Sequence, residues 1–290
     1  MMSYPLPIHP AAQIGIVRLK VRDLQKSLQF YRETVGFQVL KQYDQTAELT
    51  ADGKQSLLIL DANPEYRVLR EMSVSGLYHF AILLPDRVSL GLALRNLIKH
   101  QVPVGQGDHL VSEALYLNDP DGNGIEIYAD RPRETWQKDS SGGYIMTTDP
   151  VDVDSLLTIS ESAAWNGLPA GTRIGHVHFH VGDLLQAEQF YTRVLGFEVT
   201  AHYGKSALFV SAGGYHHHIG LNLWAGAGAP PAPEDAVGIR YFTTTLPDTS
   251  ALEAVISRLE EANVPYEREL SGISLHDPFG IGIKLEVVAA

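Results

Sequence analysis

Two histidines and one glutamate in this chain have the types and positions that could hold a divalent metal ion. His79 and His176 each lie seven residues before an aspartate, Asp86 or Asp183, that opens a predicted helical segment. Glu126 lies on a strand-like run that follows a tight turn. Two imidazoles and one carboxylate make up the facial triad of non-haem Fe(II) sites, which leaves coordination positions open. The residues alone leave Fe(II) and Mn(II) both open, because the same ligands accept either ion.

Neighbouring histidines compete for these places. His178 and His180 share a strand face with His176, because side chains alternate along a strand. The matching positions of His79 and His176 favour His176 as the ligand and make His178 and His180 pocket residues. For His79 taken alone, a place in the core as a satisfied histidine remains an alternative.

The segment that ends at Glu126 places polar groups in a fixed order. Residues 107–126 read GDHLVSEALYLNDPDGNGIE. Asp-Pro and Asp-Gly favour a turn between paired strands, so Tyr116 and Glu126 should lie on neighbouring rungs. A phenol beside a ligating carboxylate could place and stabilise a bound diol.

A run of three histidines lies on another predicted strand. Residues 213–222 read GGYHHHIGLN. Strand periodicity puts His216, His218 and Asn222 on one face and His217 on the other. A histidine run can also be a solvated edge, so the roles of His216 and His217 stay open.

An internal repeat predicts the elements that carry these residues. Residues 14–39 and 174–199 are identical at twelve positions at a constant offset of 160. Each copy has an alternating strand, then an Asp-Leu pair at a helix start, then an amphipathic helix with Phe-Tyr. Asp23 and Asp183 are expected as helix caps, and the Phe-Tyr pairs as core residues.

A second pair of matching segments completes the pattern. Residues 76–86 and 238–248 resemble each other, and predicted helices follow over 90–100 and 252–263. The chain therefore divides into four units of one strand, one helix and three strands, numbered modules 1 to 4, which cover 13–61, 73–130, 173–224 and 237–288. Modules 1 and 2 make up a first pair within 1–130, and modules 3 and 4 a second pair within 173–290. Residues 131–172 are a predicted connector with a short helix near 153–162.

These features resemble the extradiol ring-cleavage dioxygenases of the vicinal oxygen chelate superfamily. The order and spacing within 107–126 resemble the signature of those enzymes at every position. The modular repeat is similar to that superfamily over nearly the whole chain apart from the connector. The resemblance implies an α+β fold of four βαβββ modules that form two open barrels.

The resemblance also implies a reaction and a set of roles. The reaction would be the ring opening of a catechol by dioxygen beside the diol, which gives a 2-hydroxymuconic-semialdehyde-type product. His79, Glu126 and His176 would bind Fe(II). The remaining roles fall to residues of the pocket: His218 as the acid-base residue, Tyr116 and His109 as catalytic hydrogen-bonding groups, and His178, His217 and Asn222 as residues that contact the substrate or support the ligands.

The sequence departs from the commoner arrangement of that family, in which the third and fourth modules carry all three ligands. Module 1 has Ile16 at the ligand position, and module 4 has Tyr241 and Lys284. The triad is therefore complete only if modules 2 and 3 share one barrel. We expect modules 1 and 4 to form a second, metal-free barrel.

Composition narrows the class of protein. The chain has 290 residues, 44% of them hydrophobic, so it can bury a sizeable core in about two domains. A net charge of −12 without a basic block argues against nucleic-acid binding. The absence of cysteine excludes disulfides and thiolate ligands. No secretory signal or membrane-spanning run is evident, so a cytoplasmic protein is expected.

Two other functions remain as alternatives. A glyoxalase-like isomerase or thiol transferase on the same fold usually carries a fourth protein ligand. The family alignment puts Gly220 at that position, which weighs against it. A non-catalytic protein that binds an aromatic ligand would not need the full triad. The identity of the catechol stays open, and a homo-oligomer stays open because a sheet edge is expected to be exposed.

Overall fold

The computed structural model describes residues 7–70 and 72–288, which form two eight-stranded sheets. One sheet has the strand order β14-β15-β16-β13-β1-β4-β3-β2, with β1 (Gln13–Val21), β2 (Gln38–Tyr43), β3 (Thr46–Thr50), β4 (Leu58–Ala62), β13 (Gly238–Leu246), β14 (Glu267–Arg268), β15 (Gly272–His276) and β16 (Gly282–Val287). The other has the order β10-β11-β12-β9-β5-β8-β7-β6, with β5 (Gly76–Leu84), β6 (Gly105–Asp108), β7 (Ser112–Asn118), β8 (Gly124–Asp130), β9 (Arg173–His180), β10 (Glu198–Tyr203), β11 (Ala207–Ser211) and β12 (Ile219–Asn222).

The pairing of the central strands decides which modules share a sheet. Strand β5 of module 2 pairs antiparallel with β9 of module 3, and β1 of module 1 pairs antiparallel with β13 of module 4. Modules 2 and 3 therefore share one sheet, and modules 1 and 4 share the other, as expected from the placement of the candidate ligands. The α+β vicinal oxygen chelate fold that the resemblance implied is confirmed.

Short helices flank the sheets, and aspartates begin most of them. They are α1 (Leu24–Gln29), η1 (Phe30–Val35), α2 (Arg87–Lys99), η2 (Arg133–Thr135), α3 (Val153–Ile159), α4 (Leu184–Glu188), η3 (Gln189–Val194) and α5 (Thr249–Glu261). Asp23 and Asp183 accept hydrogen bonds from backbone N–H groups of the first turn, so both predicted caps are confirmed. No helix in the described part of the chain is long and apolar enough to cross a membrane.

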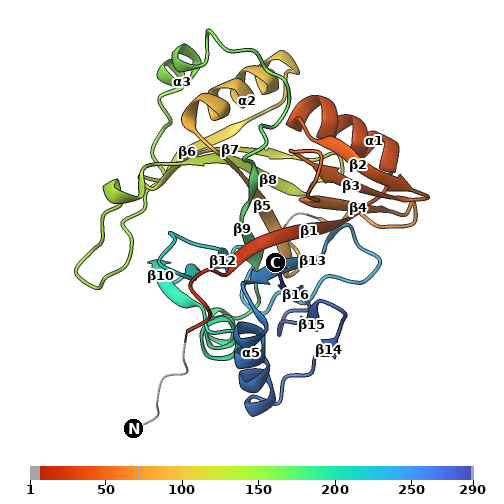
Figure 1. The fold of residues 1–290 in the computed structure, drawn as a ribbon, viewed down its shortest axis with the longest axis vertical. Coiled ribbons are helices and arrows are strands. Elements are labelled where there is room, and N and C mark those ends of the chain that lie inside the picture. Colours follow the sequence, from red (N-terminus) through yellow and green to blue (C-terminus); the bar gives the residue numbers. More distant parts are fainter. Residues whose placement is uncertain (1–6, 71, 289–290) are drawn as a thin grey trace.

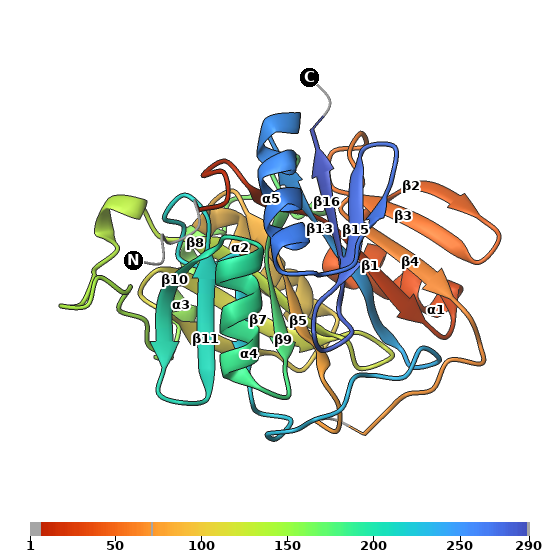
Figure 2. The same ribbon diagram turned by 90° about the horizontal axis from the view of Figure 1, so that it is seen from below.

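The hydrophobic core lies between the backs of the two sheets. Figure 1 and Figure 2 show β1 and β9 meeting in the middle of the molecule. Phe179 of β9 and Phe242 of β13 are fully buried there, with ring centroids 5.4 Å apart. Because side chains alternate along a strand, His176, His178 and His180 point from β9 to the opposite face. The histidines thus face the inside of the curved sheet.

The connector joins the two edge strands of the sheet formed by modules 2 and 3. At edge strand β6, Asp108 and Asp149 exchange backbone hydrogen bonds of 2.8 and 3.0 Å. At edge strand β10, the backbone N–H of Tyr144 donates to the carbonyl of Thr200 at 2.8 Å. Residues 131–149 therefore form a strap that links the free edges of this sheet, and this strap includes Trp136.

Two buried tyrosines tie one sheet to the other. Tyr31 in η1 donates to Asp119, which lies in the turn between β7 and β8, at 3.0 Å. Tyr191 in η3 donates to Asp277, which lies in the turn before β16, at the same distance. Each bond joins modules that lie in different sheets. The tyrosines of both Phe-Tyr pairs are core residues, as predicted, and their hydroxyl groups also cross-link the sheets.

We expect Tyr31→Phe to lower the free energy of unfolding by about 1 kcal/mol, because a buried hydrogen bond is lost while the ring still fills its site. The midpoint of urea unfolding measures this change. Tyr43→Phe is the matched control, since Tyr43 is 53% exposed and its hydroxyl donates only to Glu48. A Tyr31→Phe protein no less stable than the control would show that the bond to Asp119 does not hold the sheets together.

Candidate metal centre

Three neighbouring strands bring His79, Glu126 and His176 together. Their strands β5, β8 and β9 are adjacent in the sheet, with β5 in the middle. Ala81 of β5 lies opposite both Glu126 and His176, and irregular register on either side of Ala81 lets His79 reach the same place. The antiparallel pairing of β5 with β9 therefore brings together two histidines that are 97 residues apart in the sequence.

The three side chains converge at their terminal atoms. Nε2 of His79 and Nε2 of His176 are 3.4 Å apart, and they lie 3.0 and 3.1 Å from Oε2 of Glu126. All three residues are buried, with exposures of 5%, 3% and 1% for His79, Glu126 and His176. Three donor atoms of these types within 4.8 Å of one another make a group that could hold one metal ion.

The surroundings favour the ionised form of Glu126 and the neutral form of His176. Burial favours the neutral form of Glu126, but His176 and His79 outweigh it and hold its pKa well below the usual range. Burial lowers the pKa of His176 to about 4, against the opposing pull of Glu126. A carboxylate and a neutral imidazole are the forms that bind metals. The donor set therefore fits a divalent ion with open coordination positions.

Tyr116 and His109 form a hydrogen-bonded pair beside the triad. Tyr116 lies opposite Glu126 in the β7–β8 ladder, which confirms the expected neighbouring rungs. Its ring centroid is 5.7 Å from that of His79, and its hydroxyl is 2.6 Å from Nε2 of His109. Nδ1 of His109 lies 2.6 Å from the carbonyl of Thr147, so Nδ1 carries a proton and, in the neutral ring, the Tyr116 hydroxyl donates to Nε2. Burial, followed by the charge of Glu126, raises the pKa of Tyr116 well above its ordinary value.

The histidine run lies in a different conformation from the one expected. Strand β12 begins at Ile219, and the preceding residues form a turn followed by bends, so the predicted strand over 213–218 is wrong. Gly213 and Gly214 both have positive φ, which produces the turn. The alternation of faces predicted for the three histidines therefore does not apply.

The three histidines have separate partners. The ring of His217 lies against that of His176, with centroids 4.1 Å apart. Nδ1 of His218 accepts from the backbone N–H of Ala212 at 3.2 Å and lies 2.9 Å from the hydroxyl of Ser211. His216 contacts Asp130 through Nε2 at 2.9 Å. Burial lowers the pKa of His217 well below its ordinary value and that of His218 to about 3.

Asn222 holds the two remaining histidines of β9. Its Nδ2 donates to Nε2 of His178 at 3.0 Å, and its Oδ1 lies 2.6 Å from Nδ1 of His180. A Cβ atom on Gly220 would come within 2.8 Å of the ring of His178, so this glycine leaves room for that ring. In the described part of the chain, no fourth carboxylate or imidazole joins the metal-ligand group.

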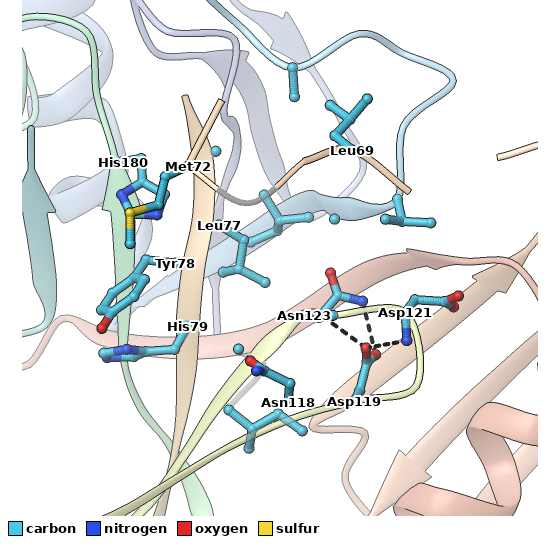
Figure 3. A pocket seen from close by; sticks show the side chains of 18 of the residues that line it. Leu69, Met72, Leu77, Tyr78, His79, Asn118, Asp119, Asp121, Asn123 and His180 are labelled. Carbon is cyan, nitrogen blue, oxygen red and sulfur yellow. Dashed lines mark hydrogen bonds between the residues drawn. The ribbon is translucent and has the colours of Figure 1, made fainter. Parts of the chain in front are cut away.

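A cavity of about 1060 Å³ reaches the site from the junction of the two sheets. Figure 3 shows His79, Tyr78 and His180 on one side of it and the Asp119 turn on the other. Leu77 lies between these two sides, Met72 lies beside His180, and Leu69 also lines the cavity. The volume is at the upper end for small-molecule sites.

Several residues near the centre were not predicted from the sequence. Tyr128 and Asp130 follow Glu126 at alternate positions of β8, so strand periodicity placed them on the same face and could have indicated them. Tyr78 packs against His79 and His178 because the irregular register of β5 turns consecutive side chains inward. Trp136 lies in the connector and contacts the ring of His216, with ring centroids 5.1 Å apart.

Paired βαβββ modules with a two-histidine, one-carboxylate site define a vicinal oxygen chelate protein. The sequence pattern of the Glyoxalase/Bleomycin resistance protein/Dioxygenase superfamily matches residues 13–127 and 173–285. A Bacillus subtilis (strain 168) protein named catechol-2,3-dioxygenase is 56% identical over 272 residues, which cover 93% of this chain and 95% of that protein. The chain belongs to this superfamily.

Solved structures share the fold. A B. subtilis subsp. subtilis str. 168 protein described as a presumed dioxygenase matches with a TM-score of 0.64 at 12% identity, covering 98% of this chain and 86% of that one. Glyoxalase I from Zea mays matches with a TM-score of 0.58 at 15% identity, covering 96% of this chain and 92% of that one. At these identities the likeness extends to the architecture alone.

Proposed function

We propose that this chain is an extradiol dioxygenase that opens the ring of a catechol with dioxygen, using a divalent metal held by His79, Glu126 and His176. The observation that carries the proposal is the convergence of these three side chains within 4.8 Å. The similarity to a relative named catechol-2,3-dioxygenase over most of both chains supports the same reaction. Fe(II) is the proposed ion, because two histidines and one carboxylate with open positions suit oxygen chemistry at iron.

Bound metal would lower the pKa of a coordinated diol and bring it next to dioxygen. The residues that would hold that ion are His79, Glu126 and His176. The cavity beside His79 has room for the ring and is lined by both apolar side chains, such as Leu77, and polar ones, such as Asn118 and Asn123. Holding both partners in one geometry converts an encounter into a near-intramolecular step.

Tyr116 and His109 would orient the diol. If the Tyr116 hydroxyl donates its hydrogen bond to His109, the phenolic oxygen still has lone pairs that can accept a hydrogen bond from a substrate hydroxyl. His218 is the residue that the family motif assigns to proton handling. Its Nδ1 is already engaged by Ala212, so a neutral His218 carries its proton on Nε2 and acts as a hydrogen-bond donor.

The direct test loads the purified protein with Fe(II) under anaerobic conditions, adds catechol and then admits air. We expect one O2 to be consumed per catechol and a yellow ring-opened product to form. An oxygen electrode and absorbance spectra follow the two quantities together.

The control is the same protein loaded with Zn(II), which binds the same ligand types but has no redox chemistry. It should bind catechol without oxygen uptake. Fe(II)-loaded protein that leaves catechol and dioxygen unchanged would refute the proposal. Isomerisation of a thiol adduct by the Ni(II) or Zn(II) form would instead identify the glyoxalase-type reaction.

A further inference from the structure

A chain of hydrogen bonds connects an aspartate at the end of β8 to the imidazole that covers His176. Oδ1 of Asp130 is 2.9 Å from Nε2 of His216, and Nδ1 of His216 is 2.8 Å from Nδ1 of His217. The ring centroids of His217 and His176 are 4.1 Å apart. His216 is completely buried, and His217 is 9% exposed.

The start of this chain is held in place from several sides. The Tyr215 hydroxyl lies 3.1 and 3.0 Å from the two carboxylate oxygens of Asp130, and 2.7 Å from the hydroxyl of Tyr128. Trp136 of the strap packs edge-on against His216, with ring centroids 5.1 Å apart. The aspartate and its histidine are therefore locked in one orientation.

These contacts fix the positions of the ring protons. The carboxylate of Asp130 can only accept, so Nε2 of His216 carries a proton and, in the neutral ring, Nδ1 of His216 is an acceptor. Nδ1 of His217 must then donate to it. This leaves the lone pair of His217 on Nε2, which has no hydrogen-bond partner among the described residues.

We propose that Asp130 and His216 are positioning residues that hold His217 with its proton on Nδ1, so that Nε2 accepts a hydrogen bond from the bound diol. This inference rests on the proposed function for its catalytic meaning. Adjacent imidazoles thus differ in their free atoms, because Nε2 of His217 carries a lone pair whereas Nε2 of His218 carries a proton and His218 lines a separate cavity beside Arg133 and Arg173. The role of hydrogen-bond acceptor thus passes from His218, which the motif indicates, to His217. The logic is that of the aspartate in serine proteases, which selects the tautomer of its histidine.

The test substitutes Asp130→Asn. The asparagine amide can donate to Nε2 of His216, which would reverse the direction of both hydrogen bonds and place the proton of His217 on Nε2. In Zn(II)-loaded protein labelled with 15N-histidine, NMR should show a protonated Nδ1 and an unprotonated Nε2 for His217 in the wild type, and the reverse in the variant. With Fe(II), kcat for catechol should fall by about 100-fold or more, as for loss of a positioned base. Metal affinity should not change, since the triad is intact.

Asp130→Glu is the conservative variant and should regain part of kcat, because it restores an acceptor. Asp149 lies in the strap but not in this series of hydrogen bonds, so Asp149→Asn should match the wild type in kcat and in the tautomer of His217. A wild-type His217 with its proton on Nε2, or an Asp130→Asn protein with an unchanged tautomer or undiminished kcat, would overturn the inference. If wild-type protein shows the expected tautomer but does not cleave catechol, the proposed function fails while the hydrogen-bond assignment stands.

Discussion

Glu126→Ala is expected to remove bound metal and ring-opening activity together. Glu126 is the only anionic member of the triad and is 3% exposed, so nothing else in the group balances the charge of a divalent ion. Loss of groups that merely support a ligand costs about 10–100-fold in metal affinity, and loss of the ligand itself should exceed that range. Titration of the anaerobic apoprotein with Fe(II) measures the affinity, and the oxygen electrode measures the activity of the same samples.

Glu269→Gln is the matched control, because Glu269 pairs with Lys284, the residue that occupies the position of Glu126 in module 4. This variant should bind Fe(II) as the wild type does. A Glu126→Ala protein that retains stoichiometric iron and normal turnover would rule out the triad as the metal site.

Gly124→Ala is expected to have the largest effect on stability. A Cβ atom at this position would lie 1.9 Å from the carbonyl oxygen of Tyr78 and 3.2 Å from Cβ of His79. The backbones of β5 and β8 would have to separate at the point where they bring the ligands together. The free energy of unfolding should fall by at least about 3 kcal/mol, the upper end for overpacked sites. Urea unfolding measures this loss, and Fe(II) affinity should fall with it because His79 moves.

Gly122→Ala, in the turn before β8, is the control that separates the steric clash at Gly124 from the cost of backbone strain. Gly122 has φ +90°, but no atom lies within 4 Å of its added Cβ. The cost should be about 1–2 kcal/mol, from the left-handed conformation alone. The Gly122→Ala protein should bind Fe(II) with the affinity of the wild type. If Gly124→Ala were as mild as this control, the close approach of β5 and β8 would not be needed to place His79.

Much of the fold could be predicted because identical residues at a constant spacing reveal the internal repeat. Asp86 and Asp248 cap α2 and α5. These helices begin at Arg87 and Thr249, three residues before the predicted starts at 90 and 252. The pairing of modules 2 and 3 followed from the places where ligands are present or missing. The ties between the sheets could not be predicted, since Tyr31 and Asp119 come from modules that pair with different partners.

The candidate site was predicted in its ligands and less well around them. His79, Glu126, His176, His109 and Tyr116 lie in regular strands or next to them, so spacing and motif order placed them together. His217 and His218 lie before β12, where two glycines turn the chain and break the period of two on which the face assignment depended. The contact of Trp136 with His216 depends on the path of the strap, which no local pattern of the sequence sets.

The arrangement of the sheets has a consequence for the protein as a unit. Each sheet takes four strands from the first half of the chain and four from the second, so a cut in the connector would leave two fragments that each hold half of both sheets. Neither fragment could satisfy the backbone groups along β1, β5, β9 and β13 on its own. The two halves are therefore obligate complements, and an ion shared by His79 and His176 would report their reassembly.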